Sequence, residues 1–411
     1  MGLSKNEGGL GFREVEAFNK ALLAKQCWRV LMNPQSLAAV LLKDKYFRNT
    51  DLLHATLGFK PSFMWKSLWD SLSLLKEGLV WRVGNGKSIK IWGDRWVPKA
   101  VTFKIQSPIQ ILNAEARVEE LLSGENGGWN EGLIKQVFDK EEAAIVCNLP
   151  ISFSKLPDKQ IWAFSKNGIY NVKSAYHVED QMELIAVVLR RIWFRRNGWV
   201  FENRFEGPND VFSQAANCLS EYQQAQETQQ AQPKQSNSQC GRALHWKPPE
   251  GDTVKVNWDA ALKSDDRKCG MGVVIRDRCG DVLASLCSCR WNVSNPVVAE
   301  VHALWRAMKL CEELKFSKVQ LEGDAKSVIN AVNNAEECWE WHGQLIEDVK
   351  SVLKNRKQWS VLHVNRVCNS VAHDLAKSAL FVEEERVWME DHPQELLKAV
   401  NFDKLCNSVN K

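Results

Sequence analysis

The stretch Thr253-Val-Lys-Val-Asn-Trp-Asp259 decides the fold of this chain, because apolar and polar residues alternate along it as they do in a half-buried β-strand. It closes on the carboxylate of Asp259. Glu300 opens an apolar helical run that begins at Pro296, and Asp324 follows the strand-like run from Val319. A single acid at such a boundary is usually a solvated cap, but the three together indicate metal-dependent chemistry.

The sequence around these acids predicts a complete α/β domain. Short polar turns separate the first three strands, which favours an antiparallel meander, and the later strands alternate with helices, which favours parallel additions to the same sheet. We therefore expect a mixed five-stranded sheet with flanking helices. The expected strands are 253–259, 270–277, 281–290, 318–323 and 359–364, and the expected helices are 297–314, 325–334, 342–355 and 368–381.

The preceding region is predicted to be mostly helical, with one β-hairpin. Residues 1–50 and Ser62 to Leu75 show helical spacing of apolar residues. Alternating apolar residues flank Gly84-Asn-Gly86, which predicts a hairpin with a tight turn. The run Gly86-Lys-Ser is similar to the end of a phosphate-binding loop, but Trp81 stands where that loop requires glycine.

Composition indicates an intracellular globular chain. Its 411 residues suffice for two or three domains, with 45% hydrophobic and 25% charged residues. No apolar run is long enough to cross a bilayer, and the start lacks the apolar core of a signal peptide. We expect a nuclear or cytoplasmic protein that is neither secreted nor in a membrane. The sequence does not indicate an oligomeric state.

The cysteines fit a reduced chain. Twelve are scattered without the spacing of a disulfide framework. Cys287 and Cys289 should share one face of a strand, where two buried thiols are favoured over metal ligation.

Charge is unevenly distributed. Residues 1–110 carry a net charge of +9, although the whole chain carries only +4. This basic part could hold a phosphate backbone, or it could be a solvated surface with no partner.

Several motifs in the first 176 residues resemble plant non-LTR retrotransposon polyproteins, in the block that follows the reverse-transcriptase catalytic domain. The resemblance rests on Gly8-Gly-Leu-Gly-Phe12, Trp81-Arg-Val-Gly-Asn-Gly86, Ile91-Trp-Gly-Asp-Arg-Trp96 and Tyr170-Asn-Val-Lys-Ser-Ala-Tyr176. The polymerase motif aromatic-x-Asp-Asp is absent. The Cys/His cluster that should follow Tyr176 is also missing, and His177 alone cannot hold a structural zinc, so no zinc is expected.

These observations predict five segments. Residues 1–110 are the post-polymerase region, and 111–222 are a truncated zinc-binding-like region. Residues 223–249 are a Gln-rich linker, because this stretch is too poor in apolar side chains to fold. The domain that carries the three acids is expected at 250–385, followed by a C-terminal tail at 386–411.

Residues 246–381 resemble the ribonuclease H type 1 domain in its plant retroelement-derived branch. The matching motifs are Val256-Asn-Trp-Asp259-Ala-Ala, Ala299-Glu300-Val-His-Ala-Leu, Glu322-Gly-Asp324-Ala-Lys-Ser and Ala372-His373-Asp374-Leu-Ala-Lys377. The resemblance implies an enzyme that cuts the RNA strand of RNA–DNA hybrids.

Such a reaction fits the chemistry of the acids. Hydrolysis of a phosphodiester needs an activated water and neutralisation of the leaving oxygen, which two divalent ions can supply. Mg²⁺ prefers oxygen ligands, and Mn²⁺ is a possible substitute. Asp259 is expected to bridge both ions, with Glu300 and Asp324 each completing one side.

The fourth catalytic position of the resembled family falls on His373, where strongly active members have aspartate. His373 could bind metal or shuttle a proton, or it could simply pack beside the site. Asp374 lies one residue later, about 100° away around a helix, and is expected to be a solvated acid.

Recognition of the hybrid would depend on backbone shape and 2′-hydroxyls. The resemblance places Gly270, Gly272 and Asn295 near the RNA strand, although each could equally be an ordinary strand or turn residue. The sequence thus predicts a ribonuclease H. The alternatives are a weak or inactive nucleic-acid-binding remnant of the same fold, or a protein without a selected role.

Overall fold

The computed structural model describes residues 15–99, 102–123, 128–178, 245–263 and 266–408. They belong to two compact units. Unit 1 combines Met1–Leu79 with Trp162–Gln239, and unit 2 combines Val80–Ile161 with Cys240–Lys411. Among the helices described, none is long and apolar enough to cross a membrane. The predicted linker and the end of the predicted zinc-binding-like region fall mostly at 179–244, outside the described residues.

The described part of unit 1 is mostly helical, as the sequence predicts. Trp65 is fully buried and its ring stacks on Tyr46 at 4.6 Å. Ser62 caps the N-terminus of the third helix, because its hydroxyl accepts a hydrogen bond from the backbone N–H of Trp65. The elements are α1 (Val15–Met32), α2 (Leu37–Tyr46), the 3₁₀ turn η2 (Leu52–His54) and α3 (Phe63–Gly78).

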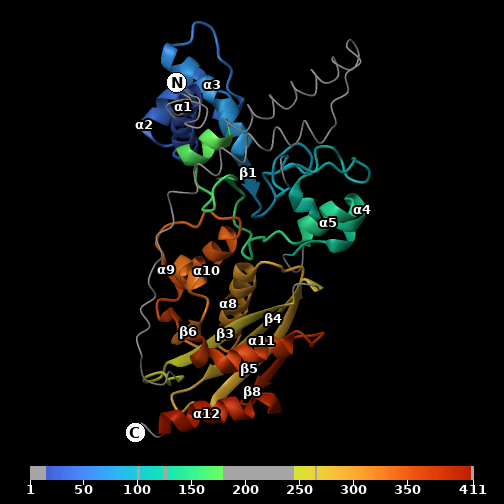
Figure 1. Cartoon of the computed structure of the whole chain (residues 1–411), viewed down its shortest axis with the longest axis vertical. Coiled ribbons are helices and arrows are strands. Elements are labelled where there is room, and N and C mark those ends of the chain that lie inside the picture. Colours follow the sequence, from blue (N-terminus) through green and yellow to red (C-terminus); the bar gives the residue numbers. More distant parts are fainter. Residues whose placement is uncertain (1–14, 100–101, 124–127, 179–244, 264–265, 409–411) are drawn as a thin grey trace, which may run out of the picture. The chain divides into compact units, whose positions relative to one another are not determined.

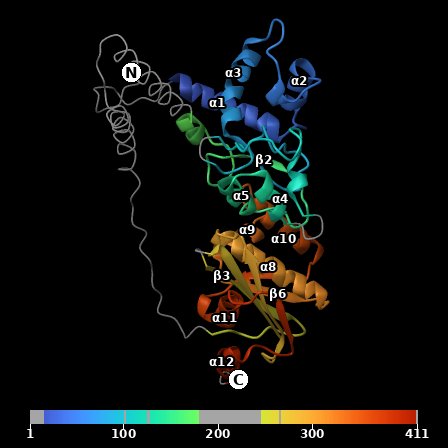
Figure 2. The same ribbon diagram turned by 90° about the vertical axis from the view of Figure 1, so that its right-hand side faces the viewer.

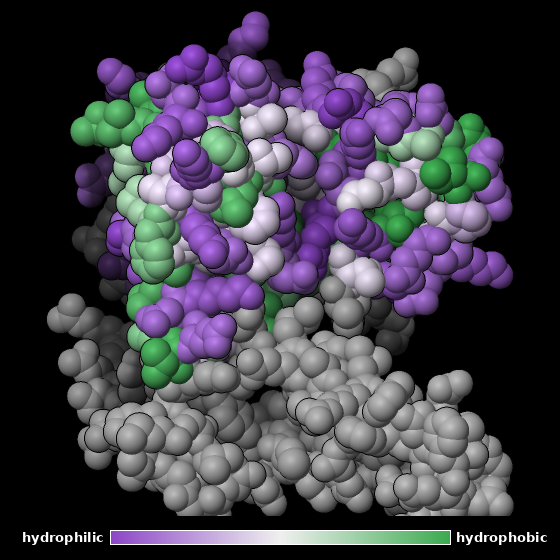
Figure 3. All heavy atoms as spheres, turned by 90° about the horizontal axis from the view of Figure 1, so that it is seen from above, coloured by the Kyte–Doolittle hydropathy of each residue, from purple (hydrophilic) through white to green (hydrophobic). Residues whose placement is uncertain are grey.

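Exposed apolar side chains lie on α2 and at the start of α3. Hydrophobic residues also stand among hydrophilic ones on the face seen from above in Figure 3. The exposed residues of unit 1 include Leu37, Val40, Leu41, Phe63 and Met64.

The N-terminal part of unit 2 differs from the predicted hairpin. β1 (Leu79–Arg82) pairs with β2 (Lys159–Trp162) instead of with the residues that follow Gly86. The glycine-rich loop after β1 instead surrounds the carboxylate of Asp158, which accepts hydrogen bonds from the N–H groups of Gly84 (2.7 Å), Gly86 (2.8 Å) and Ser88 (2.8 Å). Backbone donors that converge on an internal anion fix this loop without a hairpin.

The rest of this part forms its own small apolar core. It includes the 3₁₀ turn η3 (Val118–Leu121), α4 (Glu131–Val137) and α5 (Lys140–Cys147). Trp96 is fully buried in this core, and Trp341 from the C-terminal part of unit 2 packs against it.

A mixed six-stranded sheet organises the remainder of unit 2, in the order β7-β6-β3-β4-β5-β8. The first three strands form the predicted antiparallel meander, and β6 and β7 add in parallel. The predicted fold class is therefore confirmed. The strands are β3 (Val254–Lys263), β4 (Lys268–Arg276), β5 (Val282–Trp291), β6 (Val319–Gly323), β7 (Trp359–His363) and β8 (Arg386–Met389).

Helices cover both faces of this sheet (Figure 1, Figure 2). Consecutive strand residues point to opposite faces, so Val273 packs in the core with α8 and Val274 packs in the core with α11. The helices are α8 (Pro296–Glu313), α9 (Lys326–Asn333), α10 (Gly343–Asn355), α11 (Ser370–Ala379) and α12 (Leu397–Ser408), with the 3₁₀ turns η5 (Arg366–Asn369) and η6 (Gln394–Leu396).

The sixth strand comes from the segment predicted to be a tail. β8 pairs with β5, and Leu396 and Val400 are buried in the core beside α11. Asp403 of α12 binds the buried guanidinium of Arg276 at 2.7 Å. A tail that supplies apolar side chains and the partner of a buried cation becomes part of the domain.

Two buried charged residues join residues 80–161 to the sheet-containing part of unit 2. Arg82 donates to the carbonyl oxygens of Cys338 (2.7 Å) and Glu340 (2.8 Å). Asp348 of α10 accepts from the hydroxyl of Ser152 (2.9 Å) and from the N–H of Phe153 (2.6 Å). Both charged side chains are almost fully buried. These contacts are therefore internal to unit 2 and specify how its two sequence segments pair.

Replacing Arg82 with methionine should test this connection. Arg82→Met leaves the two carbonyl oxygens without their donor in a buried place, so the free energy of unfolding should fall by about 3 kcal/mol. Urea unfolding of the full chain, followed by circular dichroism, measures the change. The matched control is Arg356→Met, at a half-exposed arginine, which should change stability by less than about 0.5 kcal/mol. A loss at Arg82 no larger than at Arg356 would show that the connection is unimportant.

Candidate active site

Two acids of the site lie on neighbouring parallel strands. Asp259 is in the middle of β3, and its side chain is only 4% exposed. β6 pairs with β3 so that Glu322 lies beside Asn257, and Asp324 follows β6 directly. Continuing this register by two residues brings Asp324 level with Asp259. The sheet thus sets two carboxylates side by side.

The third acid comes from α8. Asn295 caps this helix, with its side-chain oxygen accepting from the N–H groups of Val297 and Val298, and Pro296 occupies the first turn. Glu300 follows one turn later. One carboxylate oxygen from each of Asp259, Glu300 and Asp324 lies within 4.8 Å of the others. The structure therefore brings together the three acids that the sequence singles out.

The cluster alters the proton affinity of its members. Burial raises the pKa of Asp259 to about 6, opposed by the hydrogen bond from His373 and reinforced by the charge of Asp324. Burial, followed by the charges of Asp259 and Asp324, raises the pKa of Glu300 to about 9. Near neutral pH, Glu300 therefore keeps a proton unless a cation offsets the neighbouring charges.

The donor set fits a hard divalent cation such as Mg²⁺ or Mn²⁺. Three carboxylates offer the oxygen ligands that these ions prefer. Oε2 of Glu300 is buried and has no hydrogen-bond partner within the described part of the chain. A buried oxygen without a donor is costly, and a cation would satisfy it. Asp259, Glu300 and Asp324 are the residues that would hold the metal.

His373 of α11 extends the cluster. Its Nδ1 lies 2.6 Å from Oδ2 of Asp259, and its Nε2 lies 3.1 Å from Nη2 of Arg366. Asn369, at the start of α11, donates from its amide to the carbonyl oxygen of Trp258, the residue before Asp259. His373 thus contacts the acid cluster, and Asn369 anchors the beginning of its helix to β3.

The two glycines predicted to lie near an RNA strand are buried under α11. A Cβ atom on Gly270 would lie 2.2 Å from the carbonyl oxygen of Ala376, and one on Gly272 would lie 2.3 Å from the carbonyl oxygen of Ala372. Only residues without a side chain allow this close approach of helix and strand. Packing alone accounts for both glycines, as capping of α8 does for Asn295.

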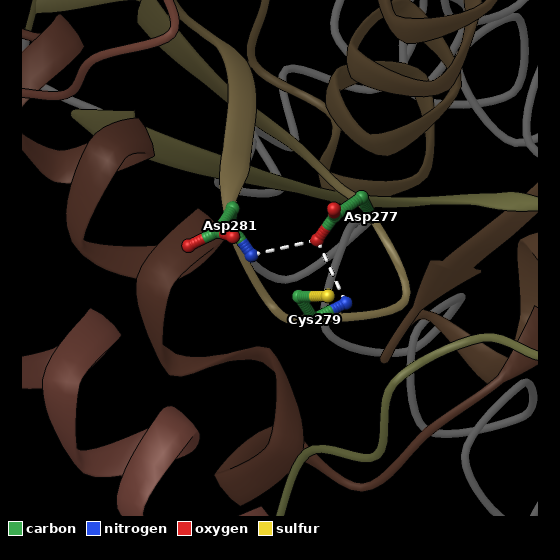
Figure 4. Close-up of side chains that lie close together, drawn as sticks. All are labelled: Asp277, Cys279 and Asp281. Atoms are coloured by element: carbon green, nitrogen blue, oxygen red, sulfur yellow. Dashed lines mark hydrogen bonds between the residues drawn. The ribbon is translucent and has the colours of Figure 1, made fainter.

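A second group of potential ligands, Asp277, Cys279 and Asp281, holds a turn together (Figure 4). Oδ1 of Asp277 accepts from the N–H groups of Cys279 and Asp281, each at 2.8 Å. Asp281 also pairs with Lys404. These contacts are those of an Asx turn that links β4 to β5. The group is therefore explained by the hairpin and not by a cation.

Two residues beside the acids had no assigned role in the sequence analysis. The stretch His363-Val-Asn-Arg366 and Asn369 also resemble the family pattern, but nothing in the residue types of Arg366 and Asn369 distinguishes them from surface residues. Their spacing from His373 is the one available signal, since seven and four residues correspond to about two turns and one turn of helix. Asp374, in contrast, is not part of the acid cluster among the described residues.

Comparisons with known proteins show what this chain is similar to. Residues 257–379 match the family model described as Reverse transcriptase-like. The chain is 40% identical over 93 residues to an uncharacterized mitochondrial protein of Arabidopsis thaliana, covering 23% of this chain and 60% of the relative. It is 28% identical over 183 residues to an Arabidopsis thaliana protein named as a candidate ribonuclease H protein, covering 42% of this chain and 29% of the relative. The chain thus spans less than two thirds of either relative.

Two solved structures are similar to part of this chain. Ribonuclease H1 from the halophilic archaeon Halobacterium salinarum has 23% identity and a TM-score of 0.30, covering 31% of this chain and 98% of that one. LC11 ribonuclease H1, solved in complex with an RNA/DNA hybrid, has 19% identity and a TM-score of 0.29, covering 31% of this chain and 96% of that one.

The packing of α11 on β4 can be tested at Gly272. A methyl group there would clash with the backbone of α11, so Gly272→Ala should lower the free energy of unfolding by about 2 kcal/mol or more. Gly128→Ala is the matched control, because nothing lies within 4 Å of the added methyl group. Urea unfolding of both variants measures the difference. Equal stabilities would contradict the packing role of Gly272.

Replacing Glu300 with glutamine should stabilise the metal-free protein, and more so at higher pH. Because the pKa of Glu300 is raised, the folded state holds a proton that the unfolded state has released between about pH 4.5 and pH 9. Wild-type stability therefore falls as pH rises through this window, and Glu300→Gln removes that loss. We expect a gain on the order of 1–2 kcal/mol at pH 8 and little gain at pH 5.

Urea unfolding in the presence of a chelator, at pH 5, 6.5 and 8, measures this dependence. Glu384→Gln, at an exposed glutamate, is the control and should have no effect at any pH. A Glu300→Gln effect that does not vary with pH would contradict a raised pKa.

Proposed function

We propose that this chain is a ribonuclease H that cuts the RNA strand of RNA–DNA hybrids with the help of divalent cations, since residues 257–379 match the reverse transcriptase-like family model. The observation that carries the proposal is that oxygens of Asp259, Glu300 and Asp324 lie within 4.8 Å of one another. The three acids come from β3, from α8 and from the end of β6. The second Arabidopsis relative is itself named as a candidate ribonuclease H protein, which supports the proposal.

Each acid has a distinct task in this proposal. Asp259 would offer a cation an oxygen from β3, the strand that pairs with β6 and packs against α8. Glu300 would contribute its buried oxygen without a donor from α8, and Asp324 would add an oxygen from the end of β6. Mg²⁺ or Mn²⁺, when bound, would activate a water and neutralise the leaving oxygen of the phosphodiester.

His373 replaces the fourth acid with a group that can carry a proton. Its Nδ1 lies within hydrogen-bond distance of Asp259, so the ring orients this carboxylate and keeps one of its oxygens engaged. A neutral imidazole also leaves the site with one negative charge fewer than an aspartate would. This smaller charge favours fewer or more weakly held cations.

The partner of this site would be recognised by its backbone. A hybrid duplex presents 2′-hydroxyls on one strand only, which lets a site select the RNA strand without reading bases. The net charge of +9 on residues 1–110 would add affinity that weakens with salt. The retrotransposon resemblance is consistent with such a substrate, and we propose an intracellular location, nuclear or cytoplasmic, for this chain.

A second candidate function is hybrid binding without turnover. The observation that favours it is the absence of a fourth carboxylate from the cluster, as seen among the described residues, with His373 in its place. The two functions differ in one measurable respect, because a binding remnant keeps affinity for the hybrid and does not cut it.

Cleavage by the full-length chain tests the proposal. The substrate is a hybrid labelled at the end of the RNA strand, incubated with Mg²⁺, with Mn²⁺ or with a chelator. We expect metal-dependent cutting of the RNA strand, and a loss of about 100-fold or more in Asp324→Asn, which removes one charge and keeps the shape. Single-stranded RNA of the same sequence should be cut far more slowly.

The opposite result is equally clear. If a wild-type protein that is folded by circular dichroism cuts the hybrid no faster than Asp324→Asn, the nuclease proposal fails. Fluorescence anisotropy then measures the affinity of the wild-type protein for the same hybrid. Retained affinity without cutting would support the binding remnant.

A further inference from the structure

Both ring nitrogens of His373 are engaged. Nδ1 faces Oδ2 of Asp259 at 2.6 Å, and Nε2 faces Nη2 of Arg366 at 3.1 Å. The side chain of His373 is 19% exposed and that of Asp259 only 4%, so the shorter contact is the more protected one. The ring lies between an obligate donor and a carboxylate.

The chemistry of the two partners selects one form of the ring. A guanidinium has N–H donors and no acceptor, so the nitrogen that faces Arg366 must accept. A neutral imidazole that accepts at Nε2 carries its proton on Nδ1, and this proton points at Asp259. The other tautomer, like the doubly protonated ring, would direct an N–H at the N–H of Arg366. One tautomer alone satisfies both contacts.

We propose that Arg366 is a positioning residue that fixes the Nδ1–H tautomer of His373 and so directs the ring proton to Asp259. Its catalytic consequence rests on the proposed nuclease function, whereas the tautomer itself does not. With the tautomer fixed, Asp259 accepts a hydrogen bond from one side and keeps a constant orientation toward Glu300 and Asp324.

The chain holds Arg366 in a suitable place for this task. The turn η5 begins at Arg366 and leads directly into α11, which carries His373. Asn365 caps the turn by accepting from the N–H of Val367 at 3.1 Å, and Asn369 ties the other end to β3. Arg366 and His373 therefore belong to one continuous segment whose two ends are fixed.

Arg366 also acts on the acid cluster through its charge. Burial and the charges of Asp259 and Asp324 raise the pKa of Glu300, and the positive charge of Arg366 opposes them. Arg366 itself is exposed, so replacing it does not open a cavity in the core. Its substitution can therefore be examined in a folded protein.

Nuclear magnetic resonance of the full-length chain labelled with ¹⁵N-histidine tests the tautomer directly. Ring nitrogens that carry a proton differ in ¹⁵N shift from those that do not, and His373→Gln identifies the signals of this ring. At a pH where the ring is neutral, wild type should show a protonated Nδ1 and an unprotonated Nε2. Arg366→Met should lose this preference, and Arg366→Lys, which keeps a donor, should retain most of it.

The matched control is Arg356→Met, which removes the same charge elsewhere on unit 2 and should leave the His373 signals unchanged. A wild-type ring protonated at Nε2 would overturn the proposal. So would an Arg366→Met ring that keeps the wild-type tautomer.

Activity gives a second and separable test. Where wild type cuts the hybrid, Arg366→Met should lower kcat by about 10- to 100-fold with little change in KM, and Arg366→Lys should recover most of the loss. An unchanged kcat in Arg366→Met would contradict the positioning role. If wild type does not cut at all, the nuclease proposal fails, and the ¹⁵N spectra still decide the tautomer.

Discussion

The confinement of three carboxyl groups within 4.8 Å, whose crowding helps to raise the pKa of Glu300, is the constraint on which the site in unit 2 depends. Such a cluster persists only if the elements that carry it cannot move apart. β3 and β6 are bound to each other by parallel pairing, and α8 packs on them through the larger core. A Cβ on Gly323 would lie 2.5 Å from the ring of Trp258, so the residue before Asp324 must be small for this packing. The rigidity of the sheet is what keeps the acids together.

Much of this sheet could be predicted from the sequence, because alternation and helical spacing are local signals. The expected helix at 297–314 is found as Pro296–Glu313, and the expected strand at 359–364 is found as Trp359–His363. The hairpin prediction was wrong, since β1 pairs with a strand about 80 residues later and the loop at Gly84 closes on Asp158 instead. β8 was not predicted for the same reason. The partner of a short strand depends on packing between distant segments, which a local sequence pattern does not show.

The candidate site divides in the same way. Asp259, Glu300 and Asp324 could be predicted from the sequence because each lies in or next to a stretch with a recognisable strand or helix pattern. The contact of His373 with Asp259 depends on how α11 lies across β3 and β4, which in turn requires Gly270 and Gly272 under the helix. The hydrogen bond from Arg366 depends on the path of a four-residue turn. These are distances between side chains, and residue types at a given spacing do not determine them.

Residues 80–161 take part in the same framework. Phe153 stacks on Trp305 at 4.6 Å and meets the edge of His302 at 5.0 Å, and both of these residues belong to α8, the helix of Glu300. Asp348 binds the backbone N–H of Phe153 and so fixes the stacking residue to α10. This hydrogen bond to buried Asp348 holds the backbone of Phe153 where its ring stacks on α8. Residues 80–161 carry none of the three acids, but through Phe153 they pack against α8 and so help to hold Glu300 in place.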